Sequence, residues 1–335
     1  MKLSFEKIKE ITNGAVRIYE MDNKVRFFRF TTAQQEIFKE ENGYNSRVFA
    51  SSGMRFDFLT DSRSLYLNVN TSKATSRSFF SFDVFVNGEY LDSLDNFTNT
   101  PIPQNYIEHE FPLGQFSKSF DLGKGTKQVT VYLPWSVCVE INEIDIEDNA
   151  FIKGLKCEKK MIIFGDSITQ GYDAFRSYNR YAGRIAQSLG AQEFNKAVGG
   201  HIFNADLALF KDLFEPEYIL VAYGTNDWSL CTKDDFTANA FGFFKNLREN
   251  YPNSKIFAIT PLWRADWMDG RPLGNFFEIG SVIKKAAEGL GIEVIDGFSL
   301  IPADTSLFSD SRLHPNDKGY NFYFENLYKE IENKA

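Results

Sequence analysis

The sequence is poor in cysteine and histidine, with three of each in 335 residues. The three histidines lie far apart along the chain, so no close His pair indicates a catalytic zinc site. The cysteines are odd in number and widely spaced, which suits a reduced compartment and forms neither a disulfide framework nor a zinc pattern: Cys138, Cys157 and Cys231. We therefore expect no metal and no cofactor.

Long hydrophobic runs and clusters of basic residues are also missing. No apolar run approaches transmembrane length, and the first ten residues contain no apolar core of signal-peptide length. We expect a cytoplasmic protein with no membrane partner, although a secreted protein whose signal was removed would leave the same record. The net charge is −8 and Lys and Arg are dispersed, which argues against nucleic acid as a partner. The sequence leaves homo-oligomerisation open.

The first 150 residues or so show hydrophobic residues that alternate with polar ones. Many short strands at regular spacing, with no convincing helical stretch, predict an antiparallel β-sandwich, jelly-roll-like, as the N-terminal domain. Asn87-Gly88 after one of these stretches is a strong hairpin signal. The period of two is clear in five places: 54–58, 65–69, 80–86, 129–133 and 137–141.

The pattern changes after a charged stretch, 145–160, which we interpret as the linker. The predicted domains are therefore 1–155 and 156–335. Beyond the linker, amphipathic helical patterns alternate with short apolar runs at 161–164, 218–223, 255–260 and 292–295. Such alternation predicts a parallel sheet covered by helices on both faces, and ligands of such sheets bind at the carboxyl ends of the strands.

One polar turn, Gly165-Asp166-Ser167, follows the first of these apolar runs. A serine there would lie at the carboxyl end of a buried strand and beside a helix N-terminus, which favours an alkoxide or a developing oxyanion. The spacing to Gly171 excludes a Walker A loop, and Thr169 breaks the G-x-S-x-G pattern of α/β-hydrolases. Taken alone, the triplet is a weak signal, and a plain helix N-cap by Asp166 or Ser167 explains it better.

Three further strand ends carry candidate groups. Asn226 follows the run at 218–223, and the turn Gly199-Gly200 brings backbone N–H groups to the same edge. His314 lies just ahead of the last predicted helix, with Asp310 close upstream. It is the histidine whose position suits a general base.

These four blocks, in this order, resemble those of the SGNH hydrolases, also called GDSL-type esterases, from Phe164 to about Asp317. The resemblance implies a flavodoxin-like, three-layer α/β/α domain and a serine esterase that hydrolyses ester bonds through an acyl-enzyme. It implies that Ser167 is the nucleophile and His314 the general base. The implied oxyanion donors are the backbone N–H groups of Ser167 and Gly200 and the side-chain amide of Asn226.

The acid of the predicted triad departs from the family pattern. The family usually has its acid three residues before the histidine, but Ser311 stands there and Asp310 lies four residues before His314. Either the turn contains one extra residue and Asp310 still reaches the imidazole, or the enzyme works as a Ser-His dyad. In the dyad a backbone carbonyl would orient the ring.

A β-sandwich ahead of such a domain resembles the two-domain carbohydrate esterases, which remove acetyl groups from sugars. The predicted partner is therefore a small-molecule or oligosaccharide acyl ester. Alternatives are a general short-acyl esterase, thioesterase or lipase-like hydrolase, and a carbohydrate-binding protein with a vestigial site. Aromatic side chains near the strand ends suit sugar rings but suit interior packing as well; the candidate substrate-binding residues are Tyr172, His201, Trp228, Trp263 and Trp267.

Overall fold

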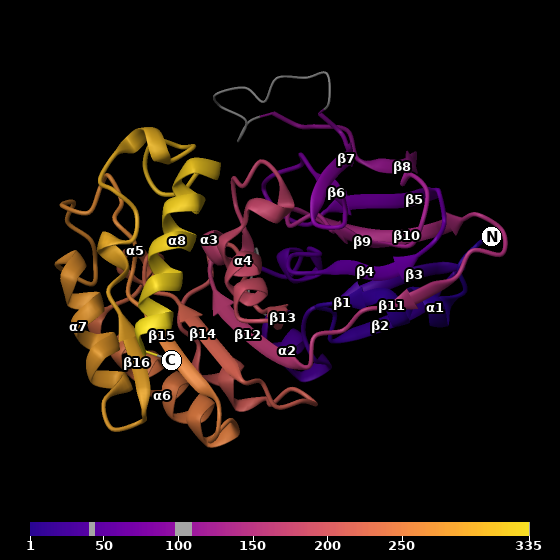
Figure 1. Cartoon of the computed structure of the whole chain (residues 1–335). Coiled ribbons are helices and arrows are strands. Elements are labelled where there is room, and N and C mark those ends of the chain that lie inside the picture. Colours follow the sequence, from indigo (N-terminus) through magenta and orange to yellow (C-terminus); the bar gives the residue numbers. More distant parts are fainter. Residues whose placement is uncertain (40–43, 98–108, 335) are drawn as a thin grey trace. The chain divides into compact units, whose positions relative to one another are not determined.

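The computed structural model describes residues 1–39, 44–97 and 109–334 and divides them into two compact units (Figure 1). Each unit consists of three separate segments of the chain, so no single boundary divides them. Residues 31–45 come from the strand-rich half but belong to unit 2, and residues 176–178 belong to unit 1. Unit 1 is Met1–Phe30, Ser46–Glu158 and Arg176–Tyr178, and unit 2 is Thr31–Asn45, Lys159–Phe175 and Asn179–Ala335.

Unit 1 consists of two antiparallel sheets and short helices. Its elements are α1 (Phe5–Ile11), β1 (Thr12–Asn13), β2 (Arg17–Met21), β3 (Lys24–Phe28), η1 (Arg47–Phe49), β4 (Arg55–Thr60), β5 (Ser64–Lys73), β6 (Ser81–Val86), β7 (Glu89–Asp95), β8 (Gly114–Asp121), β9 (Lys127–Tyr132), β10 (Val137–Ile146) and β11 (Ile152–Gly154). One sheet has the strand order β1-β4-β9-β6-β7, with β11 paired to β4. The other has the order β2-β3-β10-β5-β8. The predicted antiparallel domain is confirmed, and its two sheets are consistent with a jelly roll.

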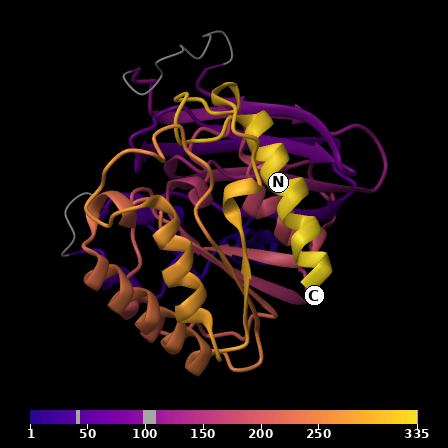
Figure 2. The same ribbon diagram turned by 90° about the vertical axis from the view of Figure 1, so that its left-hand side faces the viewer.

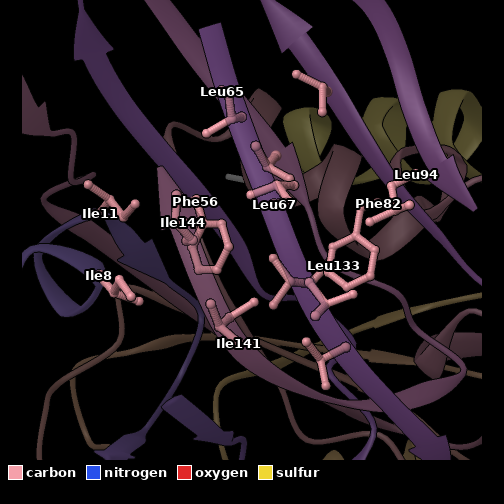
Figure 3. Close-up of a cluster of buried hydrophobic side chains, with 14 of the residues drawn as sticks. Ile8, Ile11, Phe56, Leu65, Leu67, Phe82, Leu94, Leu133, Ile141 and Ile144 are labelled. Carbon is pink, nitrogen blue, oxygen red and sulfur yellow. The ribbon is translucent and has the colours of Figure 1, made fainter. Parts of the chain in front are cut away.

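The core of unit 1 follows from the period of two in its strands. Along β5, Leu65, Leu67 and Val69 are buried and alternate with partly exposed neighbours. Side chains at alternate positions point to the same face of a sheet, so these residues form an apolar surface. Figure 3 shows this surface together with side chains from α1, β4, β6 and β10.

Unit 2 contains a parallel sheet with helices on both faces. Its elements are α2 (Thr32–Ile37), β12 (Lys159–Gly165), α3 (Ser167–Gln170), η2 (Ser177–Asn179, whose first two residues count with unit 1), α4 (Tyr181–Ser188), β13 (Ala191–Asn195), η3 (Ala205–Leu209), β14 (Tyr218–Ala222), α5 (Asp227–Leu230), α6 (Lys233–Asn250), β15 (Lys255–Ile259), α7 (Phe276–Ala287), β16 (Ile292–Ile295), η4 (Gly297–Ser299), η5 (Thr305–Leu307) and α8 (Asp317–Lys334). The strand order is β13-β12-β14-β15-β16, and every pair is parallel.

This order is the flavodoxin-like order predicted for the second half of the chain, and the prediction is confirmed. Helices α4 and α8 contact each other, and so do α6 and α7. In Figure 2 the orange helices α6 and α7 lie on one side of the strands and the yellow helix α8 lies on the other. The strand order reverses direction at β12, so the crevice beside its carboxyl end is where such a fold binds ligands.

In the described ranges, no helix combines the length and the hydropathy needed to cross a bilayer.

Candidate active site

The turn after β12 presents Ser167. Asp166 caps the single-turn helix α3 by accepting a hydrogen bond from the Ile168 N–H at 2.9 Å, and Ser167 is the first helical residue. The turn ends at Gly171, whose φ of 114° lies in the left-handed region that glycine adopts without strain. Any side chain at Gly165 would collide with that of Thr169, so this position requires glycine. The backbone thus holds the serine at the carboxyl end of the strand.

Ser167, His314 and Asp310 form a continuous chain of hydrogen bonds. Ser167 Oγ is 2.9 Å from His314 Nε2, and His314 Nδ1 is 2.8 Å from Asp310 Oδ2. Both distances are those of normal hydrogen bonds. A carboxylate on Nδ1 keeps the proton on that nitrogen and leaves Nε2 as the acceptor that faces the serine.

The turn Asp310–His314 absorbs the extra residue noted in the sequence. Ser311 adopts a φ of 54°, which bends the backbone so that three N–H groups point to one oxygen of Asp310. Asp310 Oδ1 accepts hydrogen bonds from Arg312, Leu313 and His314 at 2.9, 2.7 and 3.1 Å. The other oxygen is left for the imidazole. Of the two arrangements left open by the sequence, the structure contains the one in which Asp310 reaches the ring.

A second carboxylate, Asp173, lies near the same ring nitrogen and was not singled out from the sequence. Its Oδ2 is 3.8 Å from His314 Nδ1, too long for a hydrogen bond. The same oxygen accepts a hydrogen bond from Ser309 Oγ at 2.8 Å, and that hydroxyl lies 3.0 Å from the His314 carbonyl oxygen. Asp173 therefore supports the backbone that carries the histidine.

Three backbone N–H groups of the glycine loop after β13 are hydrogen-bonded. Val198 N–H donates to the Gly165 carbonyl at 3.0 Å, and Gly199 N–H donates to Gln170 Oε1 at 2.7 Å. His201 N–H returns to the Val198 carbonyl at 3.0 Å. Among the described residues, no protein acceptor is bonded to the N–H of Gly200. This donor is therefore available to a ligand.

Asn226 is joined to the same loop. Its side-chain amide donates to the His201 carbonyl at 3.1 Å. An amide nitrogen has two hydrogens, so one remains for a ligand. The loop is also hydrogen-bonded to the segment that carries Ser167, through the Gly165 carbonyl and the Gln170 side chain. These bonds join the three segments that contain the predicted oxyanion donors.

The electrostatics distinguish Asp310 from its buried neighbours. Burial raises the pKa of Asp166 to about 6 and that of Asp227 to about 7. Burial also acts on Asp310, but the hydrogen bond from His314 and those from the Leu313 and Arg312 N–H groups outweigh it and hold the pKa of Asp310 well below its usual range. Of these three carboxyls, Asp310 alone has a lowered pKa, so it carries a full negative charge near neutral pH and can stabilise an imidazolium.

Two of the five predicted substrate-binding residues, His201 and Trp228, are fully buried and pack against other aromatic side chains. Burial lowers the pKa of His201 to about 3, so its ring is neutral, and it packs against Phe38 and Tyr223. Trp228 donates from Nε1 to the Gly274 carbonyl at 2.8 Å and packs against Phe276. Neither side chain has an exposed face to offer a sugar in this structure.

The other three aromatic candidates differ in exposure. Tyr172 is 4% exposed and stacks on His314, with ring centroids 5.7 Å apart. Trp263 is 9% exposed and packs against Phe308. Trp267 packs against Phe277 and Phe298 but is only half-buried, so it is more exposed to solvent than Tyr172 and Trp263. Aromatic residue type alone does not separate packing from binding, so the sequence contained no signal that could have ranked them.

A flavodoxin-like sheet with a Ser-His-Asp chain at its switch point defines a serine hydrolase of the SGNH type. Residues 163–322 match the model of the GDSL-like lipase/acylhydrolase family. Residues 163–322 therefore form a domain of this family, and the resemblance predicted from the four sequence blocks is confirmed. No curated protein sequence matches the chain.

Solved structures share the fold of both halves of the chain. A salicylyl-acyltransferase, SsfX3, from a tetracycline biosynthetic pathway has a TM-score of 0.80 at 19% identity, covering 96% of this chain and 94% of that one. A putative GDSL-like lipase from Bacteroides ovatus has a TM-score of 0.77 at 18% identity, covering 99% and 97%. A family two carbohydrate esterase from Clostridium thermocellum, in complex with cellohexaose, has a TM-score of 0.65 at 17% identity, covering 93% and 98%.

Proposed function

We propose that this member of the SGNH esterase and acyltransferase family removes acetyl groups from sugars or oligosaccharides. The observation that carries the esterase part is the unbroken hydrogen-bond chain from Ser167 Oγ through His314 to Asp310. Such a chain serves to activate a serine hydroxyl as a nucleophile.

The geometry accounts for each step of ester hydrolysis. His314 Nε2 accepts the proton of Ser167 as its oxygen attacks the acyl carbonyl, while Asp310 stabilises the imidazolium that forms. The N–H groups of Ser167 and Gly200 and the amide of Asn226 hold the oxyanion of the tetrahedral intermediate. His314 then gives the proton to the leaving alcohol, and water releases the acyl group from Ser167 in a second round of the same chemistry.

The sugar part of the proposal rests on two supports. The fold of both units is shared with carbohydrate esterases, one of which was solved with cellohexaose. Trp267 of unit 2 is only half-buried, and an indole ring suits the apolar face of a sugar.

The test is a substrate panel measured on wild type and Ser167→Ala. We expect p-nitrophenyl acetate to be hydrolysed faster than longer acyl esters, and acetate to be released from acetylated saccharides. A preference for longer chains or thioesters would favour the general esterase, thioesterase or lipase-like alternative. Saccharide binding without serine-dependent turnover would favour a carbohydrate-binding protein.

The contribution of Asn226 is tested by Asn226→Ala. We expect kcat to fall by ~10²–10³ with KM much less affected, because the amide acts mainly on the oxyanion of the transition state. Steady-state kinetics on an aryl acetate measure both parameters. A variant in which KM alone changes would assign Asn226 to substrate binding.

A further inference from the structure

Residues 31–45 are encoded between strands β3 and β4 of unit 1 but fold as part of unit 2. They begin with α2, whose N-terminus is closed by a reciprocal capping box between Thr31 and Gln34. This segment contacts the glycine loop that contains Gly200, and the role proposed for it rests on the proposed esterase function.

Gln34 anchors the segment to the strand that precedes the glycine loop. Its side chain is fully buried, accepts a hydrogen bond from Lys196 Nζ at 2.8 Å, and donates to Asp212 Oδ2 at 3.2 Å. Lys196 and Asp212 are themselves fully buried and 2.7 Å apart. Buried charges are tolerated only when they are paired and hydrogen-bonded. Gln34 therefore fixes the segment to Lys196, four residues before Gly200.

Tyr44 then reaches the loop itself. Its hydroxyl donates to the Gly200 carbonyl at 3.0 Å. Its ring meets the buried His201 edge to face, with centroids 5.4 Å apart, and Phe38 of the same segment packs against that histidine. Gly200 has a φ of 82°, so its own backbone preferences restrict the loop little. A contact from outside is needed to hold this residue in one orientation.

We propose that Tyr44 is a positioning residue for the oxyanion site. It holds the carbonyl of Gly200, while Asn226 holds the next carbonyl, that of His201. The Gly200 N–H lies in the peptide between Gly199, whose own N–H is bonded to Gln170, and the Gly200 carbonyl that Tyr44 holds, so fixing these two ends limits the directions in which the N–H can point. Residues 31–45 are thus a functional part of the catalytic unit, and a fragment that starts at the linker would lack them.

The test is Tyr44→Phe in the full-length chain, assayed on p-nitrophenyl acetate. The ring packing is kept and one hydroxyl is lost. We expect kcat to fall about tenfold, part of the ~10²–10³ that one oxyanion donor supplies, with KM within about twofold of wild type. The matched control is Tyr90→Phe, which removes the 2.8 Å contact between Tyr90 and Ser93 in unit 1 and should leave both parameters unchanged.

A double-mutant cycle with Asn226→Ala gives a readout that a purely structural role would not move. Because both side chains orient the same loop, we expect their effects on kcat to be clearly non-additive. An unchanged kcat in Tyr44→Phe, with wild-type turnover still dependent on Ser167, would overturn the role of Tyr44 and leave the esterase intact. Activity lost only in proportion to lost folded protein, measured by thermal unfolding, would overturn it as well. Absence of any Ser167-dependent turnover in wild type would instead refute the proposed function, and the role of Tyr44 with it.

Discussion

Ser167→Ala is expected to lower kcat by ~10⁶, the scale measured when the nucleophile of a serine protease is removed. The loss should be confined to chemistry. The turn is held by backbone bonds from the Gly171 and Tyr172 N–H groups to the Ser167 carbonyl, at 3.0 and 2.9 Å, and these do not involve the hydroxyl. The variant should therefore fold like wild type and keep its affinity for substrate.

Covalent labelling gives an independent measurement of the same change. A fluorophosphonate probe should modify wild type at the peptide containing Ser167 and should leave Ser167→Ala unlabelled. Ser281→Ala, which removes an exposed hydroxyl on α7, should label like wild type. Undiminished labelling or turnover in Ser167→Ala would place the nucleophile elsewhere.

Asp310→Asn is expected to lower kcat by ~10⁴, the loss seen when a triad aspartate becomes asparagine. Asparagine keeps an oxygen that can accept the N–H groups of Arg312, Leu313 and His314, so the turn should persist. In place of Oδ2, which faces His314 Nδ1, asparagine has an NH₂ group that donates instead of accepting. This donor would favour the His314 tautomer that carries its proton on Nε2. In that tautomer Nε2 cannot accept the proton of Ser167.

The matched control is Asp304→Asn. Asp304 is also upstream of His314, but it is exposed and only caps η5 by accepting from the Ser306 N–H at 2.9 Å. We expect its kcat to stay within about twofold of wild type, because a capping aspartate can be replaced by asparagine at little cost. A loss below about tenfold in Asp310→Asn would argue for a Ser-His dyad. Asp173, 3.8 Å from the same ring nitrogen, would then be the next residue to replace.

Local patterns account for much of what could be predicted. A period of two predicted the antiparallel strands, because only that spacing buries one face of a sheet. Alternating apolar runs and helical patterns predicted the parallel sheet, whose carboxyl strand ends share one edge. Ser167 and Asn226 follow adjacent strands, β12 and β14, so their common edge could be inferred without coordinates. Their catalytic roles are predictions that the kinetics above test.

The sequence could not show whether Asp310 reaches the His314 ring, because this contact depends on the backbone angle of one residue, Ser311. A φ of 54° at Ser311 is uncommon for a residue with a side chain, and the surrounding hydrogen bonds stabilise it. The exposure of the aromatic candidates could not be predicted from residue type either. Tryptophan buries a large apolar area wherever it is enclosed, so residue type did not show that Trp228 is interior and Trp267 partly exposed.

By itself the sequence determined the strands of unit 1, the alternating strands and helices of unit 2 and the blocks at the strand ends, since these depend on spacing along a short stretch of chain. It did not indicate the helices α1 and α2. Only the tertiary structure decided which unit residues 31–45 belong to. Gln34 meets Lys196 across 162 residues, and Tyr44 meets Gly200 across 156. No local pattern records such pairs. They form because the buried charge of Lys196 and the flexible Gly200 each require a partner, and folding brings that partner from a distant part of the chain.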